Sequence, residues 1–409
     1  MKKNLFFLVS FLTFECFMFA ANPKILDLSK KDYQKAIEKT LLSTGNNARL
    51  KLVLEKLQNG DDVFVAALGG SVTEGAGPAD YKDGYAYQFF NKLKSDFTKN
   101  DGKNIHFDGA GLSGTPSPLG LVRYQSDVVD VLGHIPDLLI IEFAVNDGSD
   151  SFCQRGFEAL VRNALSSSEE TAVIALFSDA KTYRNTQGTM IPIARHYEIP
   201  MISIQDAVER SGVKIDEDKF FADYVHPTKD GHTFMADALI NLLEVVKKSP
   251  ADEKNQIPSE CLKQPSFEGF KRISGDDENV KISVGSFNKI DSQGQSLKKT
   301  NKSDFPQNWY RKSRGSSDES FVIEINCRSL IFVYKEQGSW MSEKFGKADI
   351  FVDGKKIETF DGGKSGGWNN AVTKLIIDEE KSANHKVEVK MAEGDENKGF
   401  TILALGYTK

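Results

Sequence analysis

The chain has 409 residues, of which 40% are hydrophobic and 27% charged, and its 52 basic and 58 acidic side chains give a formal net charge of −6. A chain of this length is too long for one ordinary core, which predicts two domains. Basic and acidic residues are interspersed, without the one-sided basic stripe that nucleic-acid binding requires, so nucleic acid is excluded as an expected partner.

Residues 1–21 have the layout of a secretory signal peptide. The segment has a basic start, an apolar stretch and an alanine pair, and it reads MKKNLFFLVSFLTFECFMFAA. Glu15 within the apolar stretch and Phe19 near the cleavage site depart from the usual pattern. No later segment approaches the roughly 20 apolar residues that span a bilayer. We expect a secreted or periplasmic protein whose mature chain has no membrane span.

Residues 22–248 alternate short apolar runs with amphipathic segments. The runs are continuous in apolar character, as in parallel strands covered on both faces, and they read DVFVAAL, NIHFDGA, DLLIIEFAV, TAVIALF and PMISI. The order predicts a doubly wound, mainly parallel α/β sheet with helices on both faces. In such sheets the ligand binds beyond the carboxyl ends of the strands, so the residues that follow each run are the candidates for a site.

Residues 249–266 are polar, contain prolines and follow no periodic pattern, so we interpret them as a linker. Residues 267–409 consist of short runs with period-two alternation separated by turn signals, which predicts an antiparallel, jelly-roll-like β-sandwich.

Trp340 and Trp368 lie near glycine-rich segments of this half. Burial in the sandwich or between the domains is the more frequent situation for tryptophan, and the alternative is an exposed ring that stacks on a sugar.

Three cysteines follow the expected signal peptide, namely Cys153, Cys261 and Cys327. Their odd number and the absence of CxxC spacing indicate neither a disulfide framework nor a zinc motif. Whether two of the three form one disulfide stays open. The sequence also has no cluster of histidine, cysteine and aspartate at metal-ligand spacing, so no metal and no cofactor are expected.

The residues that follow the predicted strands form a short set. Ser71 follows the first run within ALGGSVTEGAG, Gly114 follows the second, and Asn146 follows the third within FAVND. Asp223 and His226 lie in FADYVHPTKDGH, just before the last helix of the domain. Taken singly, each has a structural interpretation, for example a helix N-cap for the serine and a turn residue for the asparagine.

In combination, these residues provide the groups that acyl transfer requires. Imidazole, with an ordinary pKa of about 6.5, can accept a serine proton at neutral pH, and a buried aspartate three residues earlier can orient the ring. The Asn146 amide and the backbone N–H groups of Gly114 and Ser71 can donate to a developing oxyanion. His232, in contrast, is interpreted as a structural residue that faces the following helix.

The four segments GGSVTEG, GLSGT, FAVND and DYVHP resemble the motif blocks of the SGNH (GDSL-type) hydrolases over residues 62–246. The resemblance implies a three-layer α/β/α fold, Ser71 as nucleophile, His226 as general base and Asp223 as the third triad member. It also implies an oxyanion hole formed by Ser71, Gly114 and Asn146. Gly70, where many members have aspartate, and Ala144, where GxND has glycine, depart from the family pattern.

The expected function is therefore a secreted serine esterase that removes acetyl or other short acyl groups from a polysaccharide, most simply of the xylan type. Export and the appended β domain favour a carbohydrate substrate, by analogy with acetyl xylan esterases. Three alternatives stay open: a deacetylase of cell-wall polymer, a hydrolase of lipid esters or thioesters, and a non-catalytic glycan-binding surface protein. The sequence does not indicate an oligomeric state.

Overall fold

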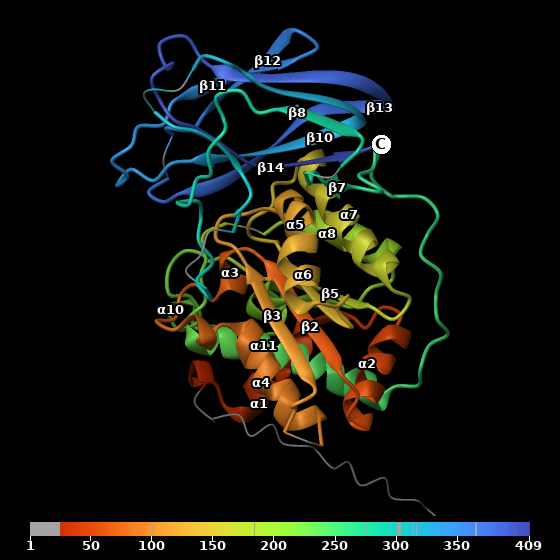
Figure 1. Cartoon of the computed structure of the whole chain (residues 1–409). Helices are drawn as coiled ribbons and strands as arrows, with labels where there is room; N and C mark the ends of the chain where they lie inside the picture. Colours follow the sequence, from red (N-terminus) through yellow and green to blue (C-terminus); the bar gives the residue numbers. More distant parts are fainter. Residues whose placement is uncertain are drawn as a thin grey trace, which may run out of the picture.

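The computed structural model describes residues 25–409, except residues 100, 184, 276, 301–303, 314, 316 and 365. It consists of an α/β domain followed by an all-antiparallel β domain, which lies above it in Figure 1. The predicted fold class is confirmed in both halves. The expected signal peptide, residues 1–21, lies outside the described residues. No described helix has the length and apolar character needed to cross a bilayer.

The first sheet has six strands in the order β1-β6-β5-β4-β2-β3, and all neighbours except β1 and β6 are parallel. The strands are β1 (Leu41–Ser43), β2 (Val63–Gly69), β3 (Ile105–Gly111), β4 (Leu138–Glu142), β5 (Ala172–Phe177) and β6 (Met201–Ser203). The chain begins the parallel part at β2, adds β3 on one side and then β4 on the other. The direction of winding reverses between β2 and β4, and a ligand crevice is expected beyond the carboxyl ends of these two strands.

Helices cover both faces of this sheet, because successive strand residues point to opposite sides. Val65 and Ala67 of β2 face one cluster, and Ala66 and Leu68 face the other. The first layer contains α1 (Lys30–Thr40), α2 (Ala48–Asn59), α4 (Tyr85–Phe97), α9 (Ile204–Arg210) and α11 (Lys229–Lys248). The second contains α5 (Ser117–Tyr124), α7 (Ser151–Ser167) and α8 (Gln187–His196).

Short helical segments complete the α/β domain. They are α3 (Ser71–Glu74), α6 (Asp130–Leu132), α10 (Glu217–Phe220), η1 (Ile25–Asp27), η2 (Tyr81–Asp83) and the π-helical turn η3 (Gln125–Val129). After α11, the chain continues without a helix or strand to β7 (Lys271–Arg272) and runs up the right side of Figure 1. This segment is attached to the first domain, since Glu158 accepts hydrogen bonds from the backbone N–H groups of Leu262 and Lys263 at 2.6 and 2.7 Å.

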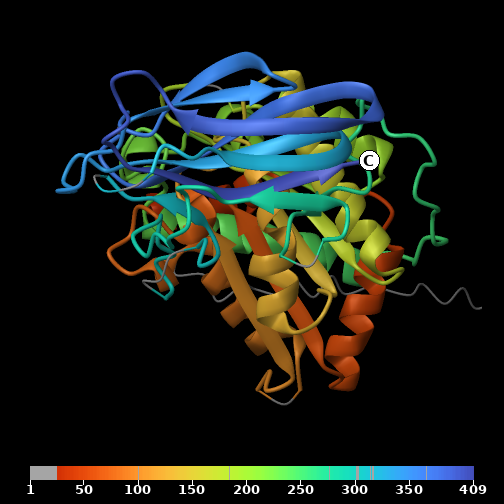
Figure 2. The same ribbon diagram turned by 45° about the horizontal axis from the view of Figure 1, so that its top comes forward.

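The second sheet has the order β12-β11-β13-β10-β14-β7, with β8 paired to β10 and β9 paired to β14. Its further strands are β8 (Val280–Ser283), β9 (Trp309–Arg311), β10 (Phe321–Glu336), β11 (Lys347–Val352), β12 (Lys355–Asp361), β13 (Asn370–Met391) and β14 (Phe400–Thr408). The long strands β10 and β13 run side by side in Figure 2, and their register shifts near Cys327 and Leu330. β8 and β14 pair with different halves of β10, so the sheet divides there.

The two domains share a continuous interface. The end of β10 is buried on both sides, with Leu330 and Phe332 in the β core and Ile331 and Val333 against helix α5 of the first domain. The fully buried Arg123 guanidinium contacts Asp304 of the second domain at 2.8 Å. Such contacts hold the β domain against the end of the α/β domain at which the candidate residues lie.

Candidate active site

Ser71 begins the short helix α3 directly after β2, and Asn146 follows β4, so both lie at the reversal of the winding. As the first residue of a helix, Ser71 has a backbone N–H without an intrahelical acceptor. Its side chain is largely buried, with 7% of the residue exposed. The local structure therefore holds the serine hydroxyl and a free donor at the edge of the sheet where the sequence predicts a ligand.

His226 lies on the loop between α10 and α11, and its Nε2 is 2.9 Å from the Ser71 Oγ. Its Nδ1 is 2.7 Å from Oδ2 of Asp223. Because a carboxylate only accepts, Nδ1 carries the proton, and the lone pair of Nε2 faces the serine hydroxyl. Although 155 residues separate the serine from the histidine, the fold joins both with Asp223 in one chain of hydrogen bonds.

The Asp223 carboxylate is also held by the backbone of its own turn. Its Oδ1 accepts from the N–H groups of Val225 and His226 at 2.9 and 2.8 Å. Partial burial acts to raise the pKa of Asp223, but these two hydrogen bonds and the bond to the His226 ring outweigh it and lower the pKa. The expectation that the Asp223 carboxylate is buried is wrong, since its side chain is 44% exposed. Its ionised form is maintained by hydrogen bonds in a short turn that remains open to water.

The glycines around Ser71 are required by close approach of other loops. A Cβ built on Gly70 would lie 2.1 Å from Oδ1 of Asn146, and one on Gly77 would lie 2.0 Å from the carbonyl oxygen of Pro227. Gly77 also has φ +112°, which side chains rarely permit. A side chain at position 70 would therefore require the Asn146 amide to shift. The glycines bring the serine, asparagine and histidine loops together.

The predicted oxyanion donors lie around the same helix. Gly114 is in the left-handed region at φ +70°, in the loop between β3 and α5. The preceding residue, Ser113, donates its hydroxyl to Glu74 of α3. Within the described part of the chain, the N–H groups of Ser71 and Gly114 have no hydrogen-bond acceptor. Two backbone donors are thus available near the serine, as an oxyanion hole requires.

His232 has a structural role, as its sequence context suggested. It is fully buried in α11, its Nδ1 accepts from the Tyr85 N–H at 3.1 Å, and its Nε2 donates to the Ala76 carbonyl at 2.9 Å. Burial lowers the pKa of His232 to about 4. The neutral ring therefore connects the loop after α3 to the start of α4.

The sequence did not predict the buried polar network that lies beneath α3. Glu142, the last residue of β4, is fully buried and accepts hydrogen bonds from Thr73 at 2.9 Å and from Ser178. The Thr73 hydroxyl also lies 2.8 Å from the Tyr85 hydroxyl. Burial raises the pKa of Glu142 against these hydrogen bonds. The available signal was a glutamate at the end of an otherwise apolar run, IIEF, which indicates a buried carboxyl with a specific partner.

Asp147 was a second omission, although it lies within the FAVND segment. Its carboxyl accepts from the backbone N–H and the hydroxyl of Ser117, both at 2.6 Å, at the N-terminus of α5. Burial raises the pKa of Asp147 to about 8. The residue thus connects the Asn146 loop to the helix that follows the Gly114 loop.

Both tryptophans singled out from the sequence are exposed, Trp340 at 68% and Trp368 at 47%, so the burial interpretation is wrong. A Cβ built on Gly114 would lie 3.4 Å from Cζ2 of Trp368, so this ring of the β domain borders the Gly114 loop. Trp340 instead lies beside Gly338, where a Cβ would be 2.6 Å from its Nε1. The thiols of Cys153, Cys261 and Cys327 are all free.

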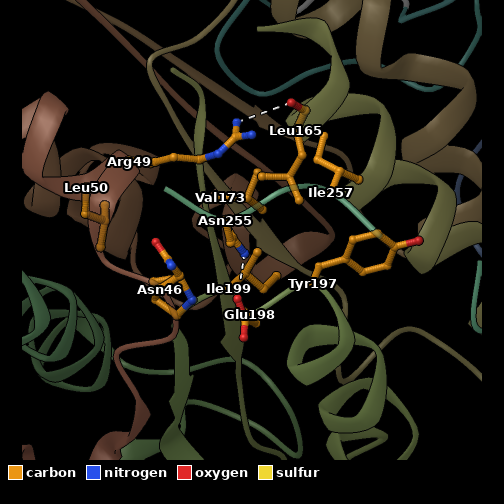
Figure 3. A pocket seen from close by; sticks show the side chains of 12 residues that line it. Asn46, Arg49, Leu50, Leu165, Val173, Tyr197, Glu198, Ile199, Asn255 and Ile257 are labelled. Carbon is orange, nitrogen blue, oxygen red and sulfur yellow. Dashed lines mark hydrogen bonds between the residues drawn. The ribbon is translucent and has the colours of Figure 1, made fainter. Parts of the chain in front are cut away.

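A separate pocket, shown in Figure 3, lies at the opposite end of the sheet, where Ala172 begins β5. Arg49 reaches into it and donates to the carbonyls of Leu165, Ser168 and Thr171. Asn255 and Ile257 of the segment between the domains also line it. Asn46 donates to the Glu253 carbonyl and Asn255 donates to Glu198, both at 2.8 Å, so polar groups of the pocket bond the crossing segment. The described residues that line the pocket include no serine, threonine or cysteine.

Comparison with known proteins agrees with this geometry. Residues 67–234 match the GDSL-like Lipase/Acylhydrolase family. A solved two-domain esterase (CEX) active on acetylated mannans is 26% identical, with a TM-score of 0.77 over 91% of this chain and 99% of that chain. The same esterase co-crystallized with mannopentaose gives 25% identity and a TM-score of 0.76 over the same shares. No curated protein sequence matches the chain.

The family match covers the strands and loops that carry Ser71, Gly114, Asn146 and His226. The match to the two-domain esterase extends through the β domain as well. Residues 67–234 are therefore a match to the GDSL-like Lipase/Acylhydrolase family within the α/β domain, and the chain is a carboxylic ester hydrolase.

Proposed function

We propose that this esterase removes O-linked acetyl groups from a plant-type polysaccharide, with acetylated mannan favoured over xylan. The observation that carries the proposal is Trp368, an exposed aromatic ring of the β domain that borders the Gly114 loop. It makes the second domain part of the surface around the candidate nucleophile. A protein of the same two-domain fold is active on acetylated mannans, which supports this substrate class.

In the proposed mechanism, the Ser71 Oγ attacks the acetyl carbonyl carbon while His226 Nε2 accepts the serine proton. The charge that develops on the carbonyl oxygen is stabilised by the N–H groups of Ser71 and Gly114 and by the Asn146 amide. The bond between the acetyl carbon and the sugar oxygen then breaks, and His226 gives the proton to that oxygen, which leaves as the sugar hydroxyl. Water, deprotonated by His226, hydrolyses the acetyl-enzyme and releases acetate.

Asp223 acts on the ring in this mechanism. Its ionised carboxylate keeps the proton on Nδ1 and stabilises the imidazolium that forms when Ser71 loses its proton. The lowered pKa of Asp223 supports this role, because the carboxylate stays charged across the range in which esterases work.

The sugar is the part of the substrate that the β domain would contact. Flat aromatic faces can stack on the apolar CH faces of sugar rings. Trp368 would hold a sugar ring while its acetyl group lies at Ser71. Trp340, exposed on the same domain, stays a second proposed contact.

An acetyl ester of mannan and one of xylan present the same carbonyl to the nucleophile, so the proposed reaction at Ser71 is the same for both. The test is acetate release from acetylated mannan, acetylated xylan and O-acetylated peptidoglycan by wild type and Ser71→Ala. We expect Ser71-dependent release that is fastest on mannan. Release fastest on peptidoglycan would instead favour a cell-wall deacetylase.

Two further measurements address the remaining alternatives. On 4-nitrophenyl esters, we expect the highest kcat/KM with acetate; a maximum at octanoate or longer would support a lipid or thioester substrate. A protein that binds the polysaccharide but releases no acetate from any of these substrates would be a glycan-binding protein. The hydrogen-bonded set of Ser71, His226 and Asp223 argues against that second class.

A further inference from the structure

The chain segment between β8 and β9 reaches from the β domain to α3 and the Gly114 loop (Figure 1). Gln295 in this segment is buried, with only 5% of the residue exposed. Its Nε2 donates to the Ser113 carbonyl at 2.6 Å, and its Oε1 accepts from the Ala371 N–H of β13 at 3.0 Å. A backbone carbonyl only accepts and a backbone N–H only donates, so the two partners determine the orientation of the Gln295 amide.

The Ser113 carbonyl and the Gly114 N–H belong to the same peptide unit. This unit is planar and trans, so its C=O and N–H bonds point in opposite directions. A group that holds the carbonyl from one side therefore determines where the N–H points on the other. Accepting a hydrogen bond at the carbonyl also polarises the unit and makes its N–H a stronger donor.

The loop is also held through the Ser113 side chain, which bonds Glu74 of α3. The Ser113 hydroxyl donates to Glu74, and the second carboxylate oxygen of Glu74 accepts from the Lys298 N–H at 3.0 Å. Gly114, at φ +70°, has no Cβ to restrict its backbone, so contacts of its neighbours must hold this conformation. Gln295 is thus the one described side chain that bonds the carbonyl of this peptide unit.

We propose that Gln295 is a positioning residue for ester hydrolysis, through which the β domain orients the Gly114 N–H toward the reacting carbonyl oxygen. The inference rests on the oxyanion role proposed above for Gly114. It assigns the second domain a part in the chemical step, separate from the sugar contact of Trp368. Gln295 touches no substrate and acts only through the Ser113–Gly114 peptide unit.

The test is steady-state hydrolysis of 4-nitrophenyl acetate, a substrate without a sugar, by wild type, Gln295→Glu and Gln295→Met. The glutamate variant would keep the shape and the acceptor for Ala371 but lose the donor, and the methionine variant would lose both. Because complete loss of one oxyanion donor lowers kcat by about 10²–10³-fold, we expect misorientation to lower kcat by about 10–100-fold, with KM within about twofold.

A second readout separates transition-state stabilisation from folding. Methylboronic acid forms a tetrahedral, negatively charged adduct with an active-site serine, so its inhibition constant should rise by the same factor as kcat falls. Asp378→Asn is the matched control. It breaks an interdomain ion pair, with Arg155 at 2.7 Å, that has no contact with the Gly114 loop, and its kcat should remain at the wild-type value.

Wild-type kcat and boronate affinity in both Gln295 variants would overturn the inference. Equal losses in Asp378→Asn and the Gln295 variants, in parallel with lowered unfolding midpoints, would also overturn it, because they would show a general effect of the interface. The proposed polysaccharide substrate does not enter this test. Failure to release acetate from any polysaccharide, with these effects on 4-nitrophenyl acetate intact, would contradict the proposed function alone.

Discussion

The two sides of the candidate site differ in how they are held. The Ser71–His226 side is built within the α/β domain, where Gly77 packs on Pro227 and His232 bonds the backbone on both sides of its ring. The Gly114 side faces the second domain, which supplies Gln295 and Trp368 from beyond the linker. We infer that the bond-making groups are placed by one domain, whereas stabilisation of the transition state and contact with the sugar depend on both.

The largest effect should come from the side built within one domain. Ser71→Ala and His226→Ala should each lower kcat by about 10⁶-fold, as triad removals do in other serine hydrolases. The loss should be the same on 4-nitrophenyl acetate and on acetylated mannan, because the same nucleophile and base act on the acetyl carbonyl of both. Acetate release and 4-nitrophenolate absorbance measure both. Near-normal turnover by either variant would rule out the proposed mechanism.

Asn146→Ala should lower kcat by about 10²–10³-fold, since it removes one side-chain donor from the oxyanion hole. Asn146 is held by the α/β domain against Gly70, so this loss should be the same in the wild-type and Asp378→Asn backgrounds. Asn146→Asp provides the sharper comparison. It has nearly the same shape, but its negative charge would repel the oxyanion, and activity at or above that of Asn146→Ala would contradict the assigned role.

His232 should make the stability of the α/β domain, which holds Ser71 and His226, decrease at acidic pH. Its folded pKa of about 4 lies below the ordinary value of 6.5, so the unfolded chain takes up this proton first as the pH falls. The stabilisation that comes from burying the neutral ring is therefore fully present above pH 6.5 and is progressively lost as the pH falls to about 4. The loss amounts to about 3 kcal/mol of unfolding free energy. Urea unfolding at several pH values measures it, and His232→Gln should flatten the slope. If the pH dependence of the unfolding free energy is unchanged in that variant, groups other than His232 cause the loss of stability in acid.

The smallest effect should come from Trp368→Ala, and only on the polysaccharide. Loss of one exposed stacking contact should raise KM for acetylated mannan about tenfold, a change of about 1.4 kcal/mol, while leaving KM for 4-nitrophenyl acetate unchanged. Trp340→Ala is the comparison variant, because that ring is also exposed on the β domain and is the second proposed contact. We expect it to raise KM for acetylated mannan less than Trp368→Ala does. Equal effects of the two substitutions would remove the distinction between them.

Local sequence patterns were sufficient to predict the parallel sheet, the antiparallel second domain and the set Ser71, Gly114, Asn146, Asp223 and His226. Continuous apolar runs predict buried strands, and the residues after parallel strands meet at one edge of the sheet. The short Asp223–His226 spacing likewise allows a hydrogen bond within one turn. The domain limits and the roles of these residues stay predictions.

The contacts between loops and between domains could be identified only from the folded structure. The exposure of Asp223 and Trp368, the buried Glu142 network and the contact of Gln295 with Ser113 depend on loops that are distant in sequence. Gln295 and Ser113 are 182 residues apart, and neither has a motif that predicts the other. Periodicity reports whether a side chain is buried, but the identity of its partner is set by the packing of one domain on the other.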